Sequence, residues 1–314
     1  MNRFRRGFIS GLSCLFYLLA GAGALELKES DQAIEVWSSG GELLLRYHKQ
    51  ESEVPEGISK IYRRSGYIHP LMTPDGRELT GDYAADHAHQ HGIFFAWTSG
   101  KYAGEKIDFW NQKKEEGRVA HKRVISKLEK DGWVSFSVEL SYFDQKDGGT
   151  EILREIWTVT VREVQGDRYQ FDLDSRQSLV GEEPLEIEKY HYGGMAIRGN
   201  VAWLGKDACE FLTSDEDARI EGNHSRPDWV AMLGELGGKP AAVVVMGHPE
   251  NFRAPQSVRI HPDKPYFCFA PMVDGKFTIT PGKEFRSRYR FLISGTALDR
   301  AWVDACWKEY SAPH

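Results

Sequence analysis

Short segments in which apolar and polar residues alternate recur along this chain, and they constrain its fold more than any other feature. A clear example is Trp133–Leu140, and further segments of this kind are 156–161, 169–173 and 285–291. Alternation with a period of two residues is typical of a β-strand that buries one face. Clusters rich in glycine, proline and aspartate, such as Pro74-Asp75-Gly76, separate these segments and predict turns.

The repeated strands, with no regular alternation of strands and helices, predict an all-β fold that forms a large antiparallel β-sandwich. The pattern changes only near the C-terminus, where apolar residues recur at helical spacing from Leu298 to Tyr310. This spacing predicts a short C-terminal helix packed on a sheet. No linker divides the chain, so we expect one domain over residues 25–314.

The first 24 residues have the three parts of a signal peptide. A basic start at Arg3, Arg5 and Arg6 precedes an apolar stretch from Phe8 to Leu19, and Ala22-Gly23-Ala24 offers a cleavage site. The stretch is shorter than the ~20 apolar residues that span a bilayer, which favours cleavage over a retained anchor. We therefore expect a periplasmic or secreted protein. The run Arg5-Arg6-Gly7-Phe8-Ile9 also resembles a twin-arginine export signal.

Charge and cysteine content narrow the class of partner. The formal net charge is −6 at pH 7, which argues against nucleic acid and anionic membrane surfaces as partners. No apolar run after the signal is long enough to span a membrane. The three cysteines beyond it, Cys209, Cys268 and Cys306, are widely spaced and predict buried free thiols. A carbohydrate or another small molecule is the expected partner.

The densest group of reactive side chains is Asp86-His87-Ala88-His89-Gln90-His91-Gly92. On a strand, His87, His89 and His91 would project to one side. Such a row can hold one divalent metal ion, zinc or copper, which makes these three residues the candidate metal ligands. His87 and His89 can equally hold a sugar and transfer protons, so they are also candidate catalytic residues.

A second group lies in the strand-like segment from Glu186 to Arg198. We expect Glu188 or His191 to act as a complementary base and Arg198 to bind a hydroxyl or an anion. Gly193-Gly194 inside this segment predicts a bulge or a close approach of the backbone to a ligand.

Further candidates for substrate binding are single residues. They are His69, held extended before Pro70, Asp228 beside Trp229, and His248 and Asn251 in a polar loop after an apolar strand. The sequence contains no nucleophile elbow, phosphate loop, dinucleotide fingerprint or paired-cysteine zinc motif.

Taken in order, these segments resemble the PmoA-like family, whose members are catalogued as "methane oxygenase PmoA". The resemblance runs from about Ile58 to Tyr310. The matching motifs are Tyr67-Ile68-His69-Pro70-Leu71, Pro74-Asp75-Gly76, Asp86-His87-Ala88-His89, Phe109-Trp110, Gly193-Gly194-Met195-Ala196-Ile197-Arg198, Asp228-Trp229-Val230, His248-Pro249-Glu250-Asn251 and Pro281-Gly282 followed by Tyr289-Arg290-Phe291. The chain departs from the family at His91, where an arginine is common, and at Tyr192, where an acidic residue is common.

The resemblance implies an exported β-sandwich from a family that occurs in bacteria rich in glycan-degrading proteins. Its architecture is similar to that of sugar-acting sandwiches such as the aldose mutarotases, which implies a supersandwich. Methane oxidation itself is carried out by membrane-embedded proteins, whereas this chain has no such span after its signal.

We therefore expect a carbohydrate-active enzyme, an epimerase, lyase or hydrolase, that uses the histidine cluster in a cleft of the sandwich. A non-catalytic glycan-binding or envelope accessory protein is the first alternative. A copper-dependent oxidase, which needs copper at His87 and His89, is the second.

Overall fold

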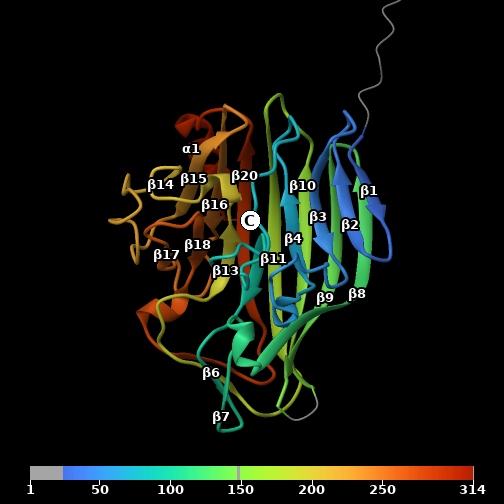
Figure 1. Ribbon diagram of the computed structural model, residues 1–314, viewed down its shortest axis with the longest axis vertical. Coiled ribbons are helices and arrows are strands. Elements are labelled where there is room, and N and C mark those ends of the chain that lie inside the picture. The colour runs from blue at the N-terminus through green and yellow to red at the C-terminus, as the bar shows by residue number, and fades with distance from the viewer. Residues whose placement is uncertain (1–23, 147–148, 314) are drawn as a thin grey trace, which may run out of the picture.

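Two large antiparallel sheets face each other in the computed structural model, which describes residues 24–146 and 149–313 (Figure 1). The expected signal peptide, up to residue 23, lies outside these residues. The first sheet has the order β1 (Glu26–Glu29), β2 (Ala33–Trp37), β3 (Leu43–His48), β4 (Tyr67–Leu71), β5 (Ile93–Ala96), β13 (Gly194–Arg198), β18 (Tyr266–Phe269) and β17 (Val258–Ile260).

The second sheet contains the four segments whose alternation is clearest in the sequence. Its order is β14 (Cys209–Thr213), β15 (Trp229–Leu236), β16 (Lys239–Gly247), β20 (Phe285–Ser294), β11 (Arg168–Leu179), β10 (Thr150–Arg162), β9 (Trp133–Asp144) and β8 (Gly117–Lys130). The four predicted strands are the neighbours β20, β11, β10 and β9, so these predictions are confirmed.

Smaller elements complete the described fold. A four-stranded sheet has the order β19 (Phe277–Ile279), β12 (Leu185–Ile187), β6 (Gly100–Tyr102) and β7 (Glu105–Ile107). Single 3-10 turns are η1 (Lys60–Tyr62), η2 (Gln112–Lys114), η3 (Val201–Trp203) and η4 (Pro271–Asp274).

The core fills the space between the two large sheets. Aromatic contacts cross it: the ring of Tyr47 on β3 lies 5.8 Å from that of Phe136 on β9 and 6.2 Å from that of Trp157 on β10. All three side chains are buried. The alternating pattern therefore points its apolar face inward from both sides, which confirms the predicted antiparallel β-sandwich.

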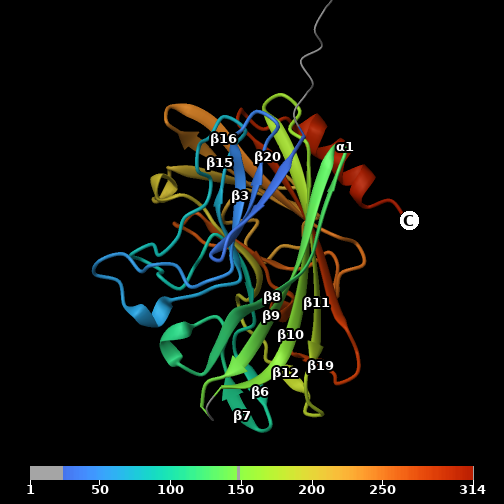
Figure 2. The ribbon, with the colours of Figure 1, turned by 90° about the vertical axis from the view of Figure 1, so that its right-hand side faces the viewer.

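The C-terminal helix is α1 (Arg300–Tyr310), which begins two residues later than predicted. The side chain of Asp299 caps it by accepting a hydrogen bond from the Trp302 backbone N–H at 3.2 Å. Its buried face, Val303, Cys306 and Tyr310, packs on the outer side of β15, β16 and β20 (Figure 2). Cys209, Cys268 and Cys306 are buried free thiols, as predicted.

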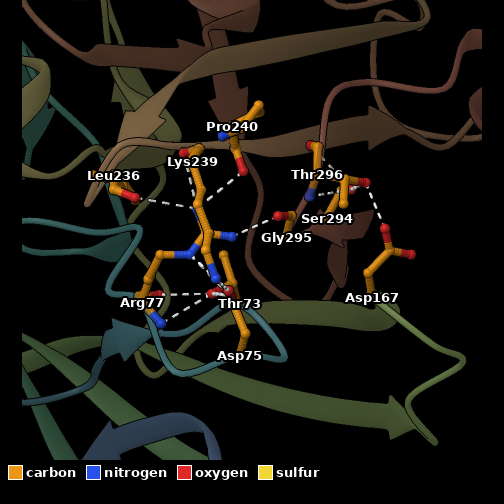
Figure 3. A network of polar contacts seen from close by, with 10 residues as sticks. All are labelled: Thr73, Asp75, Arg77, Asp167, Leu236, Lys239, Pro240, Ser294, Gly295 and Thr296. Carbon is orange, nitrogen blue, oxygen red and sulfur yellow. Dashed lines mark hydrogen bonds and ion pairs between the residues drawn. The ribbon is translucent and has the colours of Figure 1, made fainter.

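One side chain fastens the loop after β4 to the second sheet (Figure 3). The Arg77 guanidinium donates to the carbonyl oxygens of Leu236, Lys239, Pro240 and Gly295. Asp75 accepts from its Nε at 2.9 Å and balances the charge. This cationic clip joins segments that lie about half the chain apart. No helix within the described residues is long and apolar enough to cross a membrane.

Candidate functional site

Four histidines from three separate segments converge on one pocket of about 160 Å³. They are His87 and His89 from the β4–β5 loop, His191 from the β12–β13 connection and His261 just after β17. The other lining residues are Gln90, Trp110, Asn111, Tyr192, Arg259 and Tyr266. A wider hollow of about 530 Å³ adjoins it and shares His87, His89 and Asn111. We call the first of these the histidine pocket.

The loop that carries His87 and His89 is a series of turns, so the predicted strand over His87–His91 is wrong. The His87 backbone N–H donates to the Ala84 carbonyl at 2.9 Å, and the Gln90 N–H donates to the His87 carbonyl at 3.0 Å. These local bonds replace a strand ladder, and β5 begins only at Ile93. Gly92 ends the loop with a φ of +42°, where a side chain would collide with the Ile68 carbonyl.

His87 is held by a carboxylate. Its Nδ1 lies 3.0 Å from Oδ2 of Asp86. An ionised carboxylate only accepts hydrogen bonds, so Nδ1 carries the proton and Nε2 of the neutral ring is left to accept one. Burial acts to raise the pKa of Asp86, but the hydrogen bond and charge of Arg198, together with His87, hold that pKa below its ordinary value.

Arg198 supports the loop and does not line the histidine pocket. Its guanidinium is fully buried and grips Asp86 with both arms, Nη2 to Oδ1 at 2.9 Å and Nη1 to Oδ2 at 3.2 Å. Nη1 also donates to Oε1 of Gln90 at 3.0 Å. All of these contacts are to the protein itself, which suits a positioning residue, and the role of Arg198 in substrate binding stays a prediction.

Burial keeps two of the imidazoles neutral. It lowers the pKa of His89 to about 4, and the charge of His87 adds to the effect. Burial also lowers the pKa of His261 to about 4 against the opposing pull of Asp263. The pKa of His191 falls below its ordinary value through burial and then through the charge of Arg259. No hydrogen bond to another described residue engages the ring nitrogens of His89, which leaves them open to a ligand.

His91 points away from the other two histidines of its loop. Its Nδ1 lies 2.6 Å from Oδ1 of Asp82, and its Nε2 lies 3.3 Å from Oε1 of Gln112. Burial acts to raise the pKa of Asp82, but His91 and the hydrogen bonds it receives keep that pKa low. The adjacent His69 bonds through Nδ1 to Thr80 Oγ1 at 3.0 Å, and burial lowers its pKa to about 4. His69 and His91 therefore belong to a buried network behind the pocket.

This arrangement does not fit a metal site of His87, His89 and His91. The third imidazole, His91, is committed to Asp82 and Gln112. Among the residues the structure describes, no three His, Cys, Asp or Glu side chains are grouped so that they could hold a metal ion.

The segment from Glu186 to Arg198 is two strands and not one. β12 ends at Ile187 and β13 begins at Gly194, so Glu188 and Tyr190 do not share a strand face. Glu188 instead forms an exposed ion pair with Lys101 at 2.8 Å, away from the pocket. The close approach predicted at the glycine pair is real, but the neighbour is the Phe269 carbonyl of β18, which a Cβ at Gly194 would strike.

The remaining candidates lie elsewhere. Asn251 uses both ends of its amide on the Arg288 backbone of β20, with two bonds of 2.8 Å. His248 lines a different hollow with Arg288 and Tyr310. Asp228 precedes β15 near Trp307 of α1, and burial raises its pKa. The structure thus brings His87, His89 and His191 together, but none of His69, Arg198, Asp228, His248 or Asn251 lines their pocket.

Sequence reasoning missed two principal residues of the pocket, Arg259 and His261. They lie about 170 residues beyond the His87 loop, and only the pairing of β17 with β18 and of β18 with β13 brings them near. A weak signal was available in His261-Pro262-Asp263, a histidine at the end of an alternating segment.

A larger hollow of about 630 Å³ lies beside α1. Its arginines are already neutralised: Arg162 pairs with Asp172 at 3.1 Å, and Arg168 pairs with Asp299 at 3.0 Å. Its Cys306 is buried, and this burial raises the pKa of the thiol, which disfavours the thiolate. The histidine pocket is smaller but carries more groups that can transfer protons.

Comparison with known proteins finds solved structures that align over most of this chain. A heparan sulfate lyase HepC mutant from Pedobacter heparinus aligns with a TM-score of 0.40 and 8% identity over 90% of this chain. The chain spans 36% of the length of that lyase. A GalM/aldose epimerase homologue from C. elegans aligns with a TM-score of 0.38 and 8% identity, covering 87% of this chain and 100% of its own.

A search of curated proteins finds no match. The family model that matches is DUF6807, described as a family of unknown function, and the match covers residues 36–308. That range includes every residue of the histidine pocket and most of the chain, and the chain therefore belongs to the DUF6807 family.

Proposed function

We propose that the protein is a carbohydrate-acting enzyme that transfers protons through the histidine pocket, with His87 as the general base. The observation that carries this proposal is the Asp86–His87 pair at 3.0 Å, held from behind by the buried Arg198. A base whose second nitrogen is oriented by a carboxylate is a recurrent arrangement for proton abstraction. Asp86 also stabilises the imidazolium that forms when Nε2 takes a proton.

The lining of the pocket suits a sugar. Trp110 and Tyr266 form an apolar base to the pocket, and the half-buried Tyr192 ring, 5.3 Å from that of Trp110, is the aromatic group available to the apolar side of a sugar ring. Asn111 offers an amide, and neutral His89 offers one donor and one acceptor for hydroxyl groups. The Tyr192 hydroxyl donates to Asn111 Oδ1 at 3.0 Å, which fixes the amide.

The donor set favours epimerisation or elimination over hydrolysis. Glycosidases generally need two carboxyl groups on either side of the scissile bond. Among the described residues, the histidine pocket is lined by no aspartate or glutamate. Imidazoles can abstract and return a proton at carbon, which is the step that epimerases and lyases share.

Deuterium incorporation tests this proposal before the natural substrate is known. The purified protein is incubated in deuterium oxide with a panel of neutral sugars and sugar acids, and NMR follows deuterium uptake at carbon. We expect uptake from at least one sugar, and a loss of about 100-fold or more in the His87→Gln variant. His121→Gln is the matched control, because His121 lies on β8 and does not line the pocket.

Sugar binding with no deuterium uptake by the wild-type protein would overturn catalysis and support the glycan-binding alternative. Deuterium uptake by His87→Gln equal to that of the wild type would show that His87 is not the base. We also propose export to the periplasm or beyond, on the sequence pattern of residues 1–24 alone.

A further inference from the structure

Arg259 is a cation without a carboxylate partner at the edge of the histidine pocket. Its Nη1 donates to the amide oxygen of Asn223 at 3.0 Å. Within residues 24–146 and 149–313, no carboxylate oxygen lies within the 4.0 Å of its nitrogens that defines an ion pair. Arg198 lies on β13, which only β18 separates from β17 in the sheet, and it is paired with both oxygens of Asp86. Arg259 therefore has donors left for a ligand, since a guanidinium carries five N–H groups.

The nearby carboxylates are already committed. Asp86 is bound by Arg198 and His87, and Lys264 stands 3.9 Å from it. Asp263 contacts His261 Nδ1 at 2.8 Å and Lys264 at 3.5 Å. The charge of Arg259 thus stays unbalanced in a pocket whose described lining is four imidazoles, aromatic rings and amides. On a chain with a net charge of −6, this is a local positive site.

We infer that the sugar bound in the histidine pocket is a uronic acid, whose carboxylate pairs with Arg259. This inference rests on the proposed function, because it names the substrate class for the same pocket. A planar carboxylate matches the two-pronged guanidinium, as it does in Arg–carboxylate pairs within proteins. A carboxylate can also take up the electron pair of the neighbouring C–H as an enediolate, and a paired guanidinium stabilises that charge, whereas a sulfate ester or a phosphate ester gives no such intermediate.

The reaction balances with the groups present. His87 Nε2 takes the C5 proton of the uronate, and the C–H electron pair moves into the carboxylate, giving an enediolate that Arg259 stabilises. Water then delivers a proton to the opposite face of C5, which gives the epimer, and the His87 imidazolium returns its proton to the solvent. Alternatively, the electron pair forms a C4–C5 double bond while the C4–O bond breaks, and the leaving oxygen takes the proton that His87 removed.

A binding comparison tests the inference. Isothermal titration measures the affinity for glucuronate and galacturonate, for their methyl esters, and for glucose and galactose. The methyl ester keeps the shape of the uronate but removes its charge, so this comparison needs no variant. We expect the uronates to bind at least about tenfold more tightly than the esters and neutral sugars, and added salt to weaken only the uronates.

Variants then assign the preference to Arg259. Arg259→Ala should weaken uronate binding by about tenfold to a hundredfold and leave the neutral sugars nearly unchanged, with Arg259→Lys in between. Arg123→Ala is the matched control, because it removes the same charge from an exposed position on the outer face of the second sheet.

Equal affinity for uronates, esters and neutral sugars would overturn the uronate inference while leaving a sugar-binding pocket intact. Preferential binding of sulfate or phosphate sugars over uronates would also overturn it. Binding of no sugar at all would instead count against the proposed function itself.

Discussion

Arg198 and Asp86 form a two-armed ion pair, although one ends β13 and the other lies in the loop before β5, 112 residues earlier in the chain. The guanidinium is fully buried, whereas the carboxylate is partly exposed and lines the wider hollow that adjoins the histidine pocket. Because the same guanidinium also binds Gln90, it contacts the His87 loop on both sides of His89. The shape of the candidate site therefore depends on one side chain that does not line the pocket.

Replacing Arg198 by alanine should destabilise the fold by about 3 kcal/mol, since it removes a fully buried side chain with three hydrogen bonds, two of them to a carboxylate. Denaturant unfolding of the wild type and the variant measures the difference. The matched control is Arg286→Ala, which breaks an exposed two-armed pair with Asp174 and should cost less than about 1 kcal/mol. A similar cost for both variants would show that the buried pair contributes no more than a surface pair.

Replacing Asp86 by asparagine should keep the fold but remove the orientation of His87. An amide can either donate to Nδ1 or accept from it, so the neutral ring is no longer held in the tautomer with a free Nε2. Nitrogen-15 NMR of the histidine rings should show a mixed tautomer at His87, and deuterium uptake at sugar carbons should fall by about 100-fold. Lost uptake with an unchanged tautomer would assign Asp86 a role other than positioning.

The framework of the second sheet could be predicted because its strands are long and one face of each is buried. Val134, Phe136, Val138 and Leu140 of β9 all face the core, so each contributes to the same period of two. The C-terminal helix was predictable for the same reason, with an apolar face at helical spacing. Its start was missed by two residues because Leu298 belongs to the apolar cluster but precedes the Asp299 cap.

The histidine loop could not be predicted, because its conformation is decided by partners far away in the sequence. The alternating residues from His87 to His91 have the pattern of a strand. The structure nevertheless forms turns there, since Asp86 is bound by Arg198 and Gly92 lies against the Ile68 carbonyl. One consequence is that His91 is directed to Asp82 while His87 and His89 reach the pocket. Arg259 could not be predicted for a related reason. A single arginine on a short strand has no distinguishing sequence pattern, and only the structure shows that it has no carboxylate partner among the described residues.

The cationic clip should contribute to stability more than its surface position suggests. Arg77→Ala removes a charged donor from backbone carbonyls at the β15–β16 turn and after β20, and we expect a loss of about 2 kcal/mol. Denaturant unfolding measures it. Arg226→Ala is the control, because Arg226 also donates to two backbone carbonyls but is half exposed. Equal losses of unfolding free energy in the two variants would mean that the link between the two sheets adds nothing to stability.

The buried, neutral His89 should make stability depend on pH in a defined window. Its pKa is about 4 in the folded protein, compared with an ordinary value of about 6.5. The unfolded chain therefore binds more protons between these values, so the contribution of His89 is fully present above pH 6.5 and is lost as the pH falls toward 4.

The variant His89→Gln removes this dependence. Between pH 6.5 and 4, the free energy of unfolding of the wild type should fall more steeply than that of the variant, by up to about 1.4 kcal/mol per pH unit. Urea unfolding at a series of pH values measures both slopes. If His89→Gln keeps the wild-type slope, His89 accepts its proton in the folded state as readily as in water, and the pocket does not hold it neutral.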